Sequence, residues 1–208
     1  MSLISDLPLK KIEVPYKDLM YKKSGNRYVV DNSVLSNFYT LSEKIPYIHN
    51  INGHRIYYNN IEQLYVASKN PLYIVNQKTL AENIINLSPG QTKRFLQKNH
   101  IPVREDWHLK EVAYMAYFIN KKFNLSLEKK WLSNKNEKEI IEWNTWDDRR
   151  WGISFQKGDE YGIGYNALGL LIILCKQNKI NAIYPEKEWC KWQDDLIFEM
   201  SKLSDNLW

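Results

Sequence analysis

Cysteine is scarce in this sequence, which has only Cys175 and Cys190 in 208 residues. Two isolated cysteines form neither a disulfide framework nor the paired spacing of a structural zinc site, so we expect a reducing compartment. A long apolar run is also missing, because the longest one, from Ala167 to Cys175, is too short to span a bilayer. Residues 1–11 lack the apolar stretch of a signal peptide. These absences predict a cytoplasmic protein with no membrane partner.

Charge of one sign does not accumulate anywhere in the chain. The net charge is +5, but the lysines are spread out and form no block of like charges. Such a distribution favours an ordinary solvated surface, although a mildly basic chain also suits an anionic partner such as a nucleotide or nucleic acid. The four histidines lack the spacing of metal ligands, so we expect no metal and no other cofactor.

Internal repeats and low-complexity linkers are absent, and hydrophobic periodicity dominates the pattern. It predicts helices over 61–70, 77–86, 107–123, 127–132, 137–143, 167–176 and 186–203, and Ser88-Pro89-Gly90-Gln91 has the composition of a capped helix start. Asn52-Gly53 is a type I′ turn signal that predicts a hairpin over 47–58, and a second hairpin is expected near 27–30. We therefore predict a mainly α fold, a compact helical domain with one or two small β-hairpins.

The predicted helix over 61–70 carries one acid and one lysine on a single face. Glu62, Tyr65, Val66 and Lys69 share that face at about 100° per residue. One interpretation is a partly exposed stripe in which both charges reach water. The other is a pocket in which a carboxylate and an amine are sheltered together, where burial would shift their pKa values. A desolvated lysine is a nucleophile for sugar aldehyde carbons, and a carboxylate beside it can transfer protons.

A glycine-rich segment precedes the apolar helix predicted at 167–176. It runs from Asp147-Asp148-Arg149-Arg150-Trp151-Gly152 to Gly164 and Asn166. Glycines at this density allow close backbone approach to a ligand, and a helix start offers N–H groups to an anion. The spacing does not fit a dinucleotide-binding motif. The simpler interpretation is a glycine-rich turn in which Asn166 caps the helix.

Taken in order, the segments of this chain resemble the NADAR family, also called YbiA-like. No single motif is specific to the family, but the order of the motifs over about residues 34–177 is specific to it. The motifs are Leu35-Ser36-Asn37-Phe38, Tyr58 to Glu62 with Tyr65, Ala67 and Lys69, Ser88-Pro89 with Lys93-Arg94, Arg104-Glu105-Asp106-Trp107, Met115, Lys122-Phe123, Ile141-Glu142, Asp148 to Gly152, and Gly164 to Gly169.

The resemblance implies a YbiA-like helical domain with N-glycosidase activity. Members act on riboflavin-pathway intermediates or remove ADP-ribose from guanine in nucleic acid, and the basic chain slightly favours the second. The resemblance makes Glu62, Lys69 and Asp148 the expected catalytic residues, with Lys69 forming a Schiff base or Glu62 activating a water. The expected substrate-binding residues are Ser36, Asn37, Phe38, Tyr58, Arg104, Trp107, Trp151, Gly152, Gly164 and Asn166, of which Arg104 and the helix start at Gly164–Asn166 would receive phosphates.

The family domain is expected over residues 34–179, between an arm at 1–33 and a C-terminal helical extension at 180–208 packed on the same domain. The expected partner is an ADP-ribosyl or ribosyl-phosphate substrate, with nucleic acid as the carrier of the modified base. Two alternatives belong to other functional classes. One is a silent module that binds ADP-ribose or nucleic acid, and the other is an interaction protein using Trp189, Trp192, Leu196 and Ile197 as a sticky helix face.

Overall fold

The computed structural model describes residues 9–15, 28–29, 34–49, 54–69, 84–137, 140–144, 147–180 and 184–207. The helices are α2 (Ile61–Lys69), α5 (Pro89–Lys98), α6 (Glu111–Phe123), α7 (Ser126–Ser133), α8 (Ala167–Lys176) and α9 (Trp189–Leu207), with the 3-10 turns η2 (Trp107–Leu109) and η4 (Glu186–Glu188). The strands are β1 (Ile12–Pro15), β2 (Tyr28–Val29), β3 (Ile45–His49), β4 (His54–Tyr58), β5 (Ile140–Ile141), β6 (Trp143–Asn144), β7 (Ile153–Ser154) and β8 (Tyr161–Gly164).

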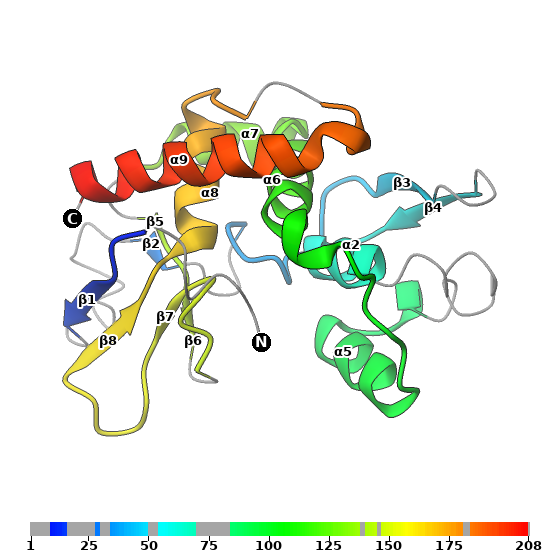
Figure 1. The fold of residues 1–208 in the computed structure, drawn as a ribbon, viewed down its shortest axis with the longest axis horizontal. Helices are drawn as coiled ribbons and strands as arrows, with labels where there is room; N and C mark the ends of the chain where they lie inside the picture. The colour runs from blue at the N-terminus through cyan, green and yellow to red at the C-terminus, as the bar shows by residue number, and fades with distance from the viewer. Residues whose placement is uncertain are drawn as a thin grey trace.

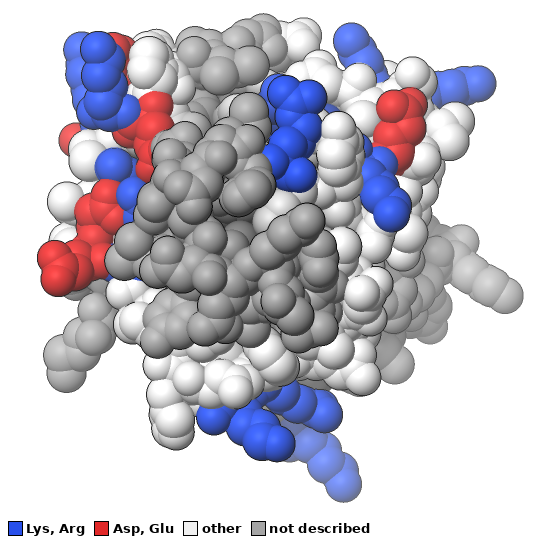
Figure 2. All heavy atoms as spheres, turned by 90° about the vertical axis from the view of Figure 1, so that its right-hand side faces the viewer, with Lys and Arg blue, Asp and Glu red and all other residues white. Residues whose placement is uncertain are grey.

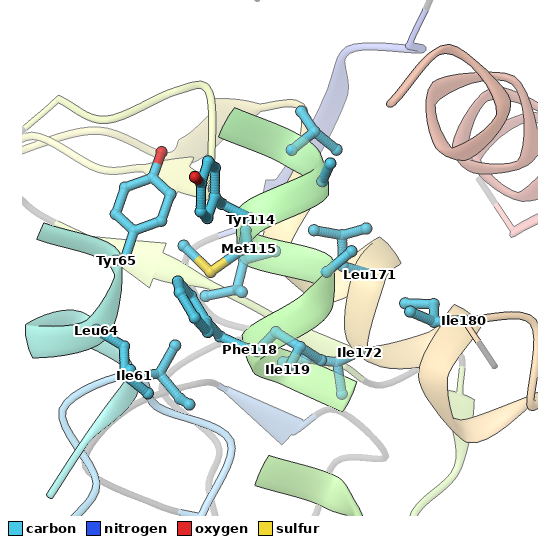
Figure 3. Packing of buried hydrophobic residues seen from close by; sticks show 14 of the residues in the cluster. Ile61, Leu64, Tyr65, Tyr114, Met115, Phe118, Ile119, Leu171, Ile172 and Ile180 are labelled. Atoms are coloured by element: carbon cyan, nitrogen blue, oxygen red, sulfur yellow. The ribbon is translucent and has the colours of Figure 1, made fainter. Parts of the chain in front are cut away.

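Helix α6 is the centre of the fold, with α2, α8 and α9 packed around it (Figure 1). One stripe of α6 is buried along its whole length; it consists of Val112, Met115, Ala116, Ile119 and Phe123. Tyr114 and Phe118 on another side are also fully buried. Figure 3 shows both rings pointing toward α2, while Ile119 lies beside Leu171 and Ile172 of α8. A helix that is buried on several sides occupies the interior of the fold.

The structure confirms the predicted helices at 61–70, 127–132 and 167–176. Each observed end differs from the predicted end by no more than one residue. The helix predicted at 107–123 is broken into η2 and α6 at Lys110, and the C-terminal helix likewise begins as a 3-10 turn. Of the helix predicted at 77–86, only residues 84–86 are described, and they are helical.

A four-stranded sheet in the order β1-β8-β7-β6 is the main feature that the prediction of a mainly α fold missed. The fold is a mixture of helices and sheets. The helix predicted at 137–143 was wrong, because Ile140–Ile141 and Trp143–Asn144 are strands that pair in parallel with β2 and β7. Both isoleucines are fully buried. Two β-branched residues buried in succession suit a strand covered on both faces, a pattern that periodicity cannot separate from a buried helix.

One predicted hairpin is present, and most residues of the other lie outside the described part of the chain. Strands β3 and β4 pair antiparallel from Ile45 opposite Tyr58 to His49 opposite His54, and the predicted Asn52-Gly53 turn between them lies outside the described residues. Near the second predicted hairpin, the described residues Tyr28 and Val29 pair in parallel with β5. That pairing is a long-range contact, which a local turn signal cannot predict.

Asn166 is the N-cap residue of helix α8, as predicted, but its side chain makes no capping hydrogen bond and instead binds the segment of strand β5. Its amide oxygen accepts from the Glu142 backbone N–H at 2.9 Å, and its amide nitrogen donates to the Ile140 carbonyl at 3.0 Å. The residue has a φ of 52°, a left-handed conformation that asparagine tolerates better than most residues. By contrast, the capping box predicted at Ser88 and Gln91 is confirmed at the start of α5.

The C-terminal helix is part of the core of the domain. Trp189, Trp192 and Leu196 are at most 5% exposed where α9 packs on α6 and α8. These three residues therefore do not form the exposed sticky face that one interpretation required. The N-terminal segment is tied in as well, because β1 pairs antiparallel with β8.

Two glycines give a matched pair of stability predictions. A Cβ at Gly164 would overlap the backbone carbonyl of Gly152, whereas a Cβ at Gly90 in α5 would meet nothing within 4 Å. We expect Gly164→Ala to lower the free energy of unfolding by at least about 2 kcal/mol, because backbone atoms cannot move aside cheaply. Gly90→Ala should cause no loss and a gain of up to about 1 kcal/mol. Urea denaturation of both variants checks this, and equal effects would contradict the packing described here.

Candidate functional site

A pocket of about 730 Å³ opens beside helix α2, within the range typical of small-molecule sites. Glu62, Tyr65, Val66 and Lys69 all line it, so the face of α2 predicted to carry an acid and a lysine is the face that meets the pocket. The other pocket-lining residues are Ser36, Asn37, Phe38, Lys93, Leu96, Gln97, His100, Ile101, Val103, Glu111, Met115, Glu142, Trp143, Asn144, Asp148, Arg150, Trp151 and Leu168.

Glu62 is buried near the start of α2 and is held from two sides. Its backbone N–H donates to the Asn37 carbonyl at 3.1 Å, which fixes the loop at 35–38 to the helix start. Its carboxylate forms an ion pair with Lys93 of α5 at 2.8 Å. The Glu62 side chain is only 7% exposed, whereas that of Lys93 is 51% exposed. A ligand that enters the pocket can therefore displace the flexible lysine and reach the fixed carboxylate.

Lys69 ends the same helix two turns later, about 10 Å along the axis. Its amine lies 5.7 Å from the centre of the Tyr65 ring and 5.6 Å from that of Trp107. Within the described part of the chain, no carboxylate oxygen lies within ion-pair distance of this amine. Burial lowers the pKa of Lys69, and the Glu62 carboxylate opposes this only in part. More of this amine is therefore neutral, and nucleophilic, than in an ordinary lysine.

Asp148 faces the pocket from the turn that precedes strand β7. One of its carboxylate oxygens accepts from the backbone N–H groups of Arg150 and Trp151, at 3.1 and 3.0 Å. Asn144 clamps the Asp148 backbone from both sides with its amide. The turn is therefore rigid, and it presents a carboxylate to the cavity in a fixed orientation.

The loop at 35–38 forms another wall and rests on a buried lysine. The Lys122 amine donates to the carbonyls of Leu35 and Ser36, at 3.3 and 2.7 Å. Asn37 is 8% exposed, its amide nitrogen contacts the Met115 sulfur at 3.5 Å, and its amide oxygen has no hydrogen-bond partner among the described residues. Phe38 is 40% exposed beside it. The loop at 35–38 thus presents the Asn37 amide oxygen beside the Phe38 ring.

Removing the Lys122 amine should change how stability depends on pH. Burial lowers the pKa of this amine to about 7 from 10.5. Between these values the unfolded chain binds more protons than the folded one, so the contribution of Lys122 to stability rises with pH. The stability of the wild type minus that of Lys122→Met should therefore increase from pH 7 to pH 10 in urea titrations. A difference that stays constant or falls over this window would contradict the burial of a titrating amine.

Arg150 and Trp151 form a further part of the pocket lining. Arg150 forms an ion pair with Glu111, which is buried in the first turn of α6. The Trp151 ring lies edge-on to Tyr65, with 5.8 Å between the ring centres. Charged groups and aromatic rings therefore both line the cavity, a combination that suits a polar ligand with a ring.

The sequence model of the NADAR domain matches residues 21–178, which is most of the chain. The chain belongs to the NADAR family. The searches of curated proteins and of solved structures returned no match.

The NADAR domain of this chain brings seven of the thirteen predicted site residues to one cavity. These are Ser36, Asn37, Phe38, Glu62, Lys69, Asp148 and Trp151. Lys93, Glu111, Glu142, Trp143 and Arg150 also line it and were not predicted as site residues. Lys93 and Arg150 lie in the family motifs, and for Arg150 the motif acid Asp148 two positions earlier was an available signal. The sequence contained no such signal for Glu111, because an acidic residue is common in the first turn of a helix.

Six predicted site residues of the NADAR domain do not line the pocket. Tyr58 is fully buried in the core, and Trp107 lies behind Tyr65 and Lys69. Gly152 and Gly164 pack against each other, and a Cβ on either would collide with its neighbours. Arg104 and Asn166 are the remaining two. Arg104 is held by Asp106, Tyr114 and Glu186, while Asn166 binds strand β5.

The described part of the NADAR chain contains no group of three or more metal-ligating side chains. None of its described helices is long and apolar enough to cross a membrane. Cys175 and Cys190 are free thiols.

Proposed function

We propose that this protein is an N-glycosidase that hydrolyses the C1–N bond between ribose and a base, releasing ADP-ribose from ADP-ribosylated guanine in nucleic acid. The NADAR family is associated with N-glycosidase-type activity. The observation that carries the proposal is the meeting of Lys69, Glu62 and Asp148 in one pocket. We further propose that it acts in the reducing cytoplasm, where two unpaired cysteines remain thiols.

The first step breaks the C1–N bond, which places oxocarbenium-like positive charge on the ribose. Glu62 gives its proton to the departing nitrogen, and the carboxylate that remains stabilises the positive charge on the ribose from a buried position. The base leaves with the bonding electron pair and this proton. Lys93, which pairs with Glu62 at 2.8 Å, would move aside toward phosphate oxygens as the substrate enters.

The second step uses the neutral amine of Lys69 as a nucleophile at C1. The new C–N bond leads, after ring opening and loss of one amine proton to Glu62, to a Schiff base between Lys69 and the sugar. Water then adds to this C=N bond, and the amine departs to regenerate Lys69. The net reaction consumes one water and yields the free base and the sugar with a hydroxyl on C1. Because burial lowers the pKa of Lys69, turnover should rise with pH in a range below that of an ordinary lysine.

Substrate binding is divided among the other walls of the pocket. We propose that Asp148 accepts hydrogen bonds from the ribose hydroxyls and that the exposed Phe38 ring stacks on the base. Trp151 would wall the sugar, and the Asn37 amide oxygen would accept a hydrogen bond from the substrate. The diphosphate would lie near Lys93 and His100 at the α5 rim, because the expected receivers Arg104 and Asn166 lie outside the pocket lining.

The α5 rim also supports nucleic acid as the carrier of the modified base. Helix α5 has the sequence PGQTKRFLQK with no acidic residue, and Lys93, Arg94 and Lys98 are exposed on it. Figure 2 shows basic side chains projecting from the lower edge of the molecule, the height at which α5 lies in Figure 1. A cationic helix at the mouth of the pocket would attract the phosphates that flank a modified guanine.

Removing the outer charges of α5 should weaken action on DNA alone. For Arg94→Gln/Lys98→Gln we expect kcat/KM on an ADP-ribosylated oligonucleotide to fall about tenfold at low salt, with a shallower salt dependence. Activity on the free ADP-ribosyl nucleoside should stay unchanged. Lys187→Gln/Lys191→Gln, which removes two exposed charges near the start of α9, is the control. Equal loss on both substrates, or loss in the control, would contradict a docking role for α5.

Incubation of the full chain with a panel of ribosylated substrates tests the proposed function. The panel holds ADP-ribosylated guanine in DNA, the free nucleoside and the early riboflavin intermediates, and chromatography measures released sugar and base. We expect ADP-ribose and unmodified guanine from the first two. Release from the riboflavin intermediates alone would make the protein an N-glycosidase of that pathway. Binding of ADP-ribose without release from any substrate would make it a silent module.

A further inference from the structure

A polar cluster outside the pocket links Arg104 and Tyr114 to Glu186. The Arg104 guanidinium donates to Asp106 at 2.8 Å, to the Tyr114 hydroxyl and to the Glu186 carboxylate at 3.1 Å. The Tyr114 hydroxyl donates in turn to Glu186 at 2.6 Å. Lys110 adds an ion pair to Asp106 at 2.8 Å. Because the Arg104 side chain is only 16% exposed, these contacts are largely shielded and hold the segment 104–106 firmly.

The segment held by this cluster is the support of Lys69. The Arg104 backbone N–H donates to the Lys69 carbonyl at 2.8 Å, so it ties down the end of helix α2. The Trp107 ring, three residues on, lies 5.6 Å from the Lys69 amine and packs edge-on against Tyr65. A shift of 104–107 would therefore move both the backbone of Lys69 and the ring that shelters its amine.

Glu186 comes from a part of the chain that the family match, ending at residue 178, does not include. The helix that follows it is fixed on the same region. Gln193 accepts from the Val112 N–H at 2.8 Å and donates to the His108 carbonyl at 3.0 Å. It thereby satisfies the start of α6, where Lys110 provides no side-chain cap. Trp189 packs edge-on against Tyr114, with ring centres 4.5 Å apart.

We infer that Glu186 is a positioning residue for Lys69, acting through Arg104 and Tyr114 to hold the segment 104–107 against the end of α2. The inference rests on the proposed role of Lys69 for its effect on turnover. On this inference, the segment after residue 178, which lies outside the family match, helps to position the site residue Lys69.

Loosening the support should change both the placement and the protonation of the amine. The charged groups with the largest influence on Lys69 are Glu62 on the same helix, Lys93 on α5, and Asp148 and Arg150 in the turn before β7. None of them is altered when Glu186 is changed. Water admitted behind Trp107 would weaken the desolvation that lowers the pKa of Lys69, so that pKa would rise. In a variant that stays folded, a lower free energy of unfolding alone would not produce this shift.

The test compares Glu186→Gln and Tyr114→Phe with the control Glu188→Gln, an exposed acid in the same 3-10 turn. We expect kcat to fall roughly tenfold to a hundredfold in the first two with little change in KM. The acid limb of the pH profile should move to higher pH. A second readout needs no turnover: reductive methylation with formaldehyde, measured at Lys69 by peptide mass spectrometry as a function of pH. Half-maximal labelling should also move to higher pH, and Glu188→Gln should match the wild type.

The two readouts separate the inference from the proposed function. If the wild type releases no sugar from any substrate but the labelling shift is present, the positioning role stands and the glycosidase function fails. If Glu186→Gln does not fold, Tyr114→Phe decides, because it removes one hydroxyl and keeps the ring. Wild-type labelling at Lys69 in the folded variants, or labelling that shifts equally in Glu188→Gln, overturns the inference.

Discussion

Lys69→Ala should lose at least about a thousandfold in kcat while staying folded, because the nucleophile that forms the Schiff base is gone. Substrate affinity should change much less, since Asp148, Phe38 and Trp151 remain in place. The measurement is single-turnover release of ADP-ribose across a range of substrate concentrations, with circular dichroism to confirm the fold. Lys129→Ala, which removes an exposed lysine of α7, should behave as wild type.

Lys69→Arg distinguishes chemistry from charge. Arginine keeps the positive charge near the Tyr65 and Trp107 rings, but it stays protonated and forms no Schiff base. We therefore expect the arginine variant to be as inactive as the alanine variant. If it kept most of the activity, Lys69 would act as a cation that binds phosphate, and the nucleophilic role would be wrong.

Glu62→Gln should lower kcat by about a hundredfold to ten thousandfold, the range by which general acid–base groups accelerate reactions. Glutamine keeps the size of the side chain and removes both the charge and the transferable proton. The helix start should persist, because the backbone bond from Glu62 to the Asn37 carbonyl does not involve the side chain. Steady-state kinetics on the oligonucleotide measures the change, with the exposed Glu160→Gln as the matched control.

The Lys93 ion pair permits a second check on Glu62. Lys93→Met removes the partner 2.8 Å from the carboxylate but leaves the acid itself. Its effect should lie mainly in KM, because we place Lys93 among the phosphate-binding groups. If Glu62→Gln kept full activity while Lys93→Met lost it, the acid would only hold the lysine in position, and the proton transfer assigned to Glu62 would be excluded.

Sequence periodicity predicted the part of the site that lies on one regular element. Helix α2 turns at 3.6 residues per turn, so the four residues that share a face in the pattern necessarily share a wall in space. The same reasoning identified α8 as a buried helix and Ser88 as a cap, since both depend on local sequence.

Long-range pairing was not predictable from the same pattern. Ile140 and Ile141 become strand residues because β2, more than a hundred positions earlier in the chain, pairs with them. Asn166 looks like a local cap, yet its amide binds β5 instead. In the sequence Arg104 resembles a phosphate ligand, but in the structure its guanidinium binds Glu186 from near the C-terminus. For the isoleucines and Asn166 the deciding partner is remote, and the sequence near the residue contains no sign of it. Arg104 also binds Asp106, two residues away, which is visible in the sequence.

Borohydride trapping during turnover tests the central claim most directly, which is that the sheltered amine of Lys69 attacks C1 of the ribose. The full chain is mixed with ADP-ribosylated oligonucleotide and reductant, digested, and mapped by mass spectrometry. We predict a single sugar adduct, located on Lys69 and absent without substrate. Turnover that leaves Lys69 unmodified, or an adduct on Lys93 instead, would contradict it.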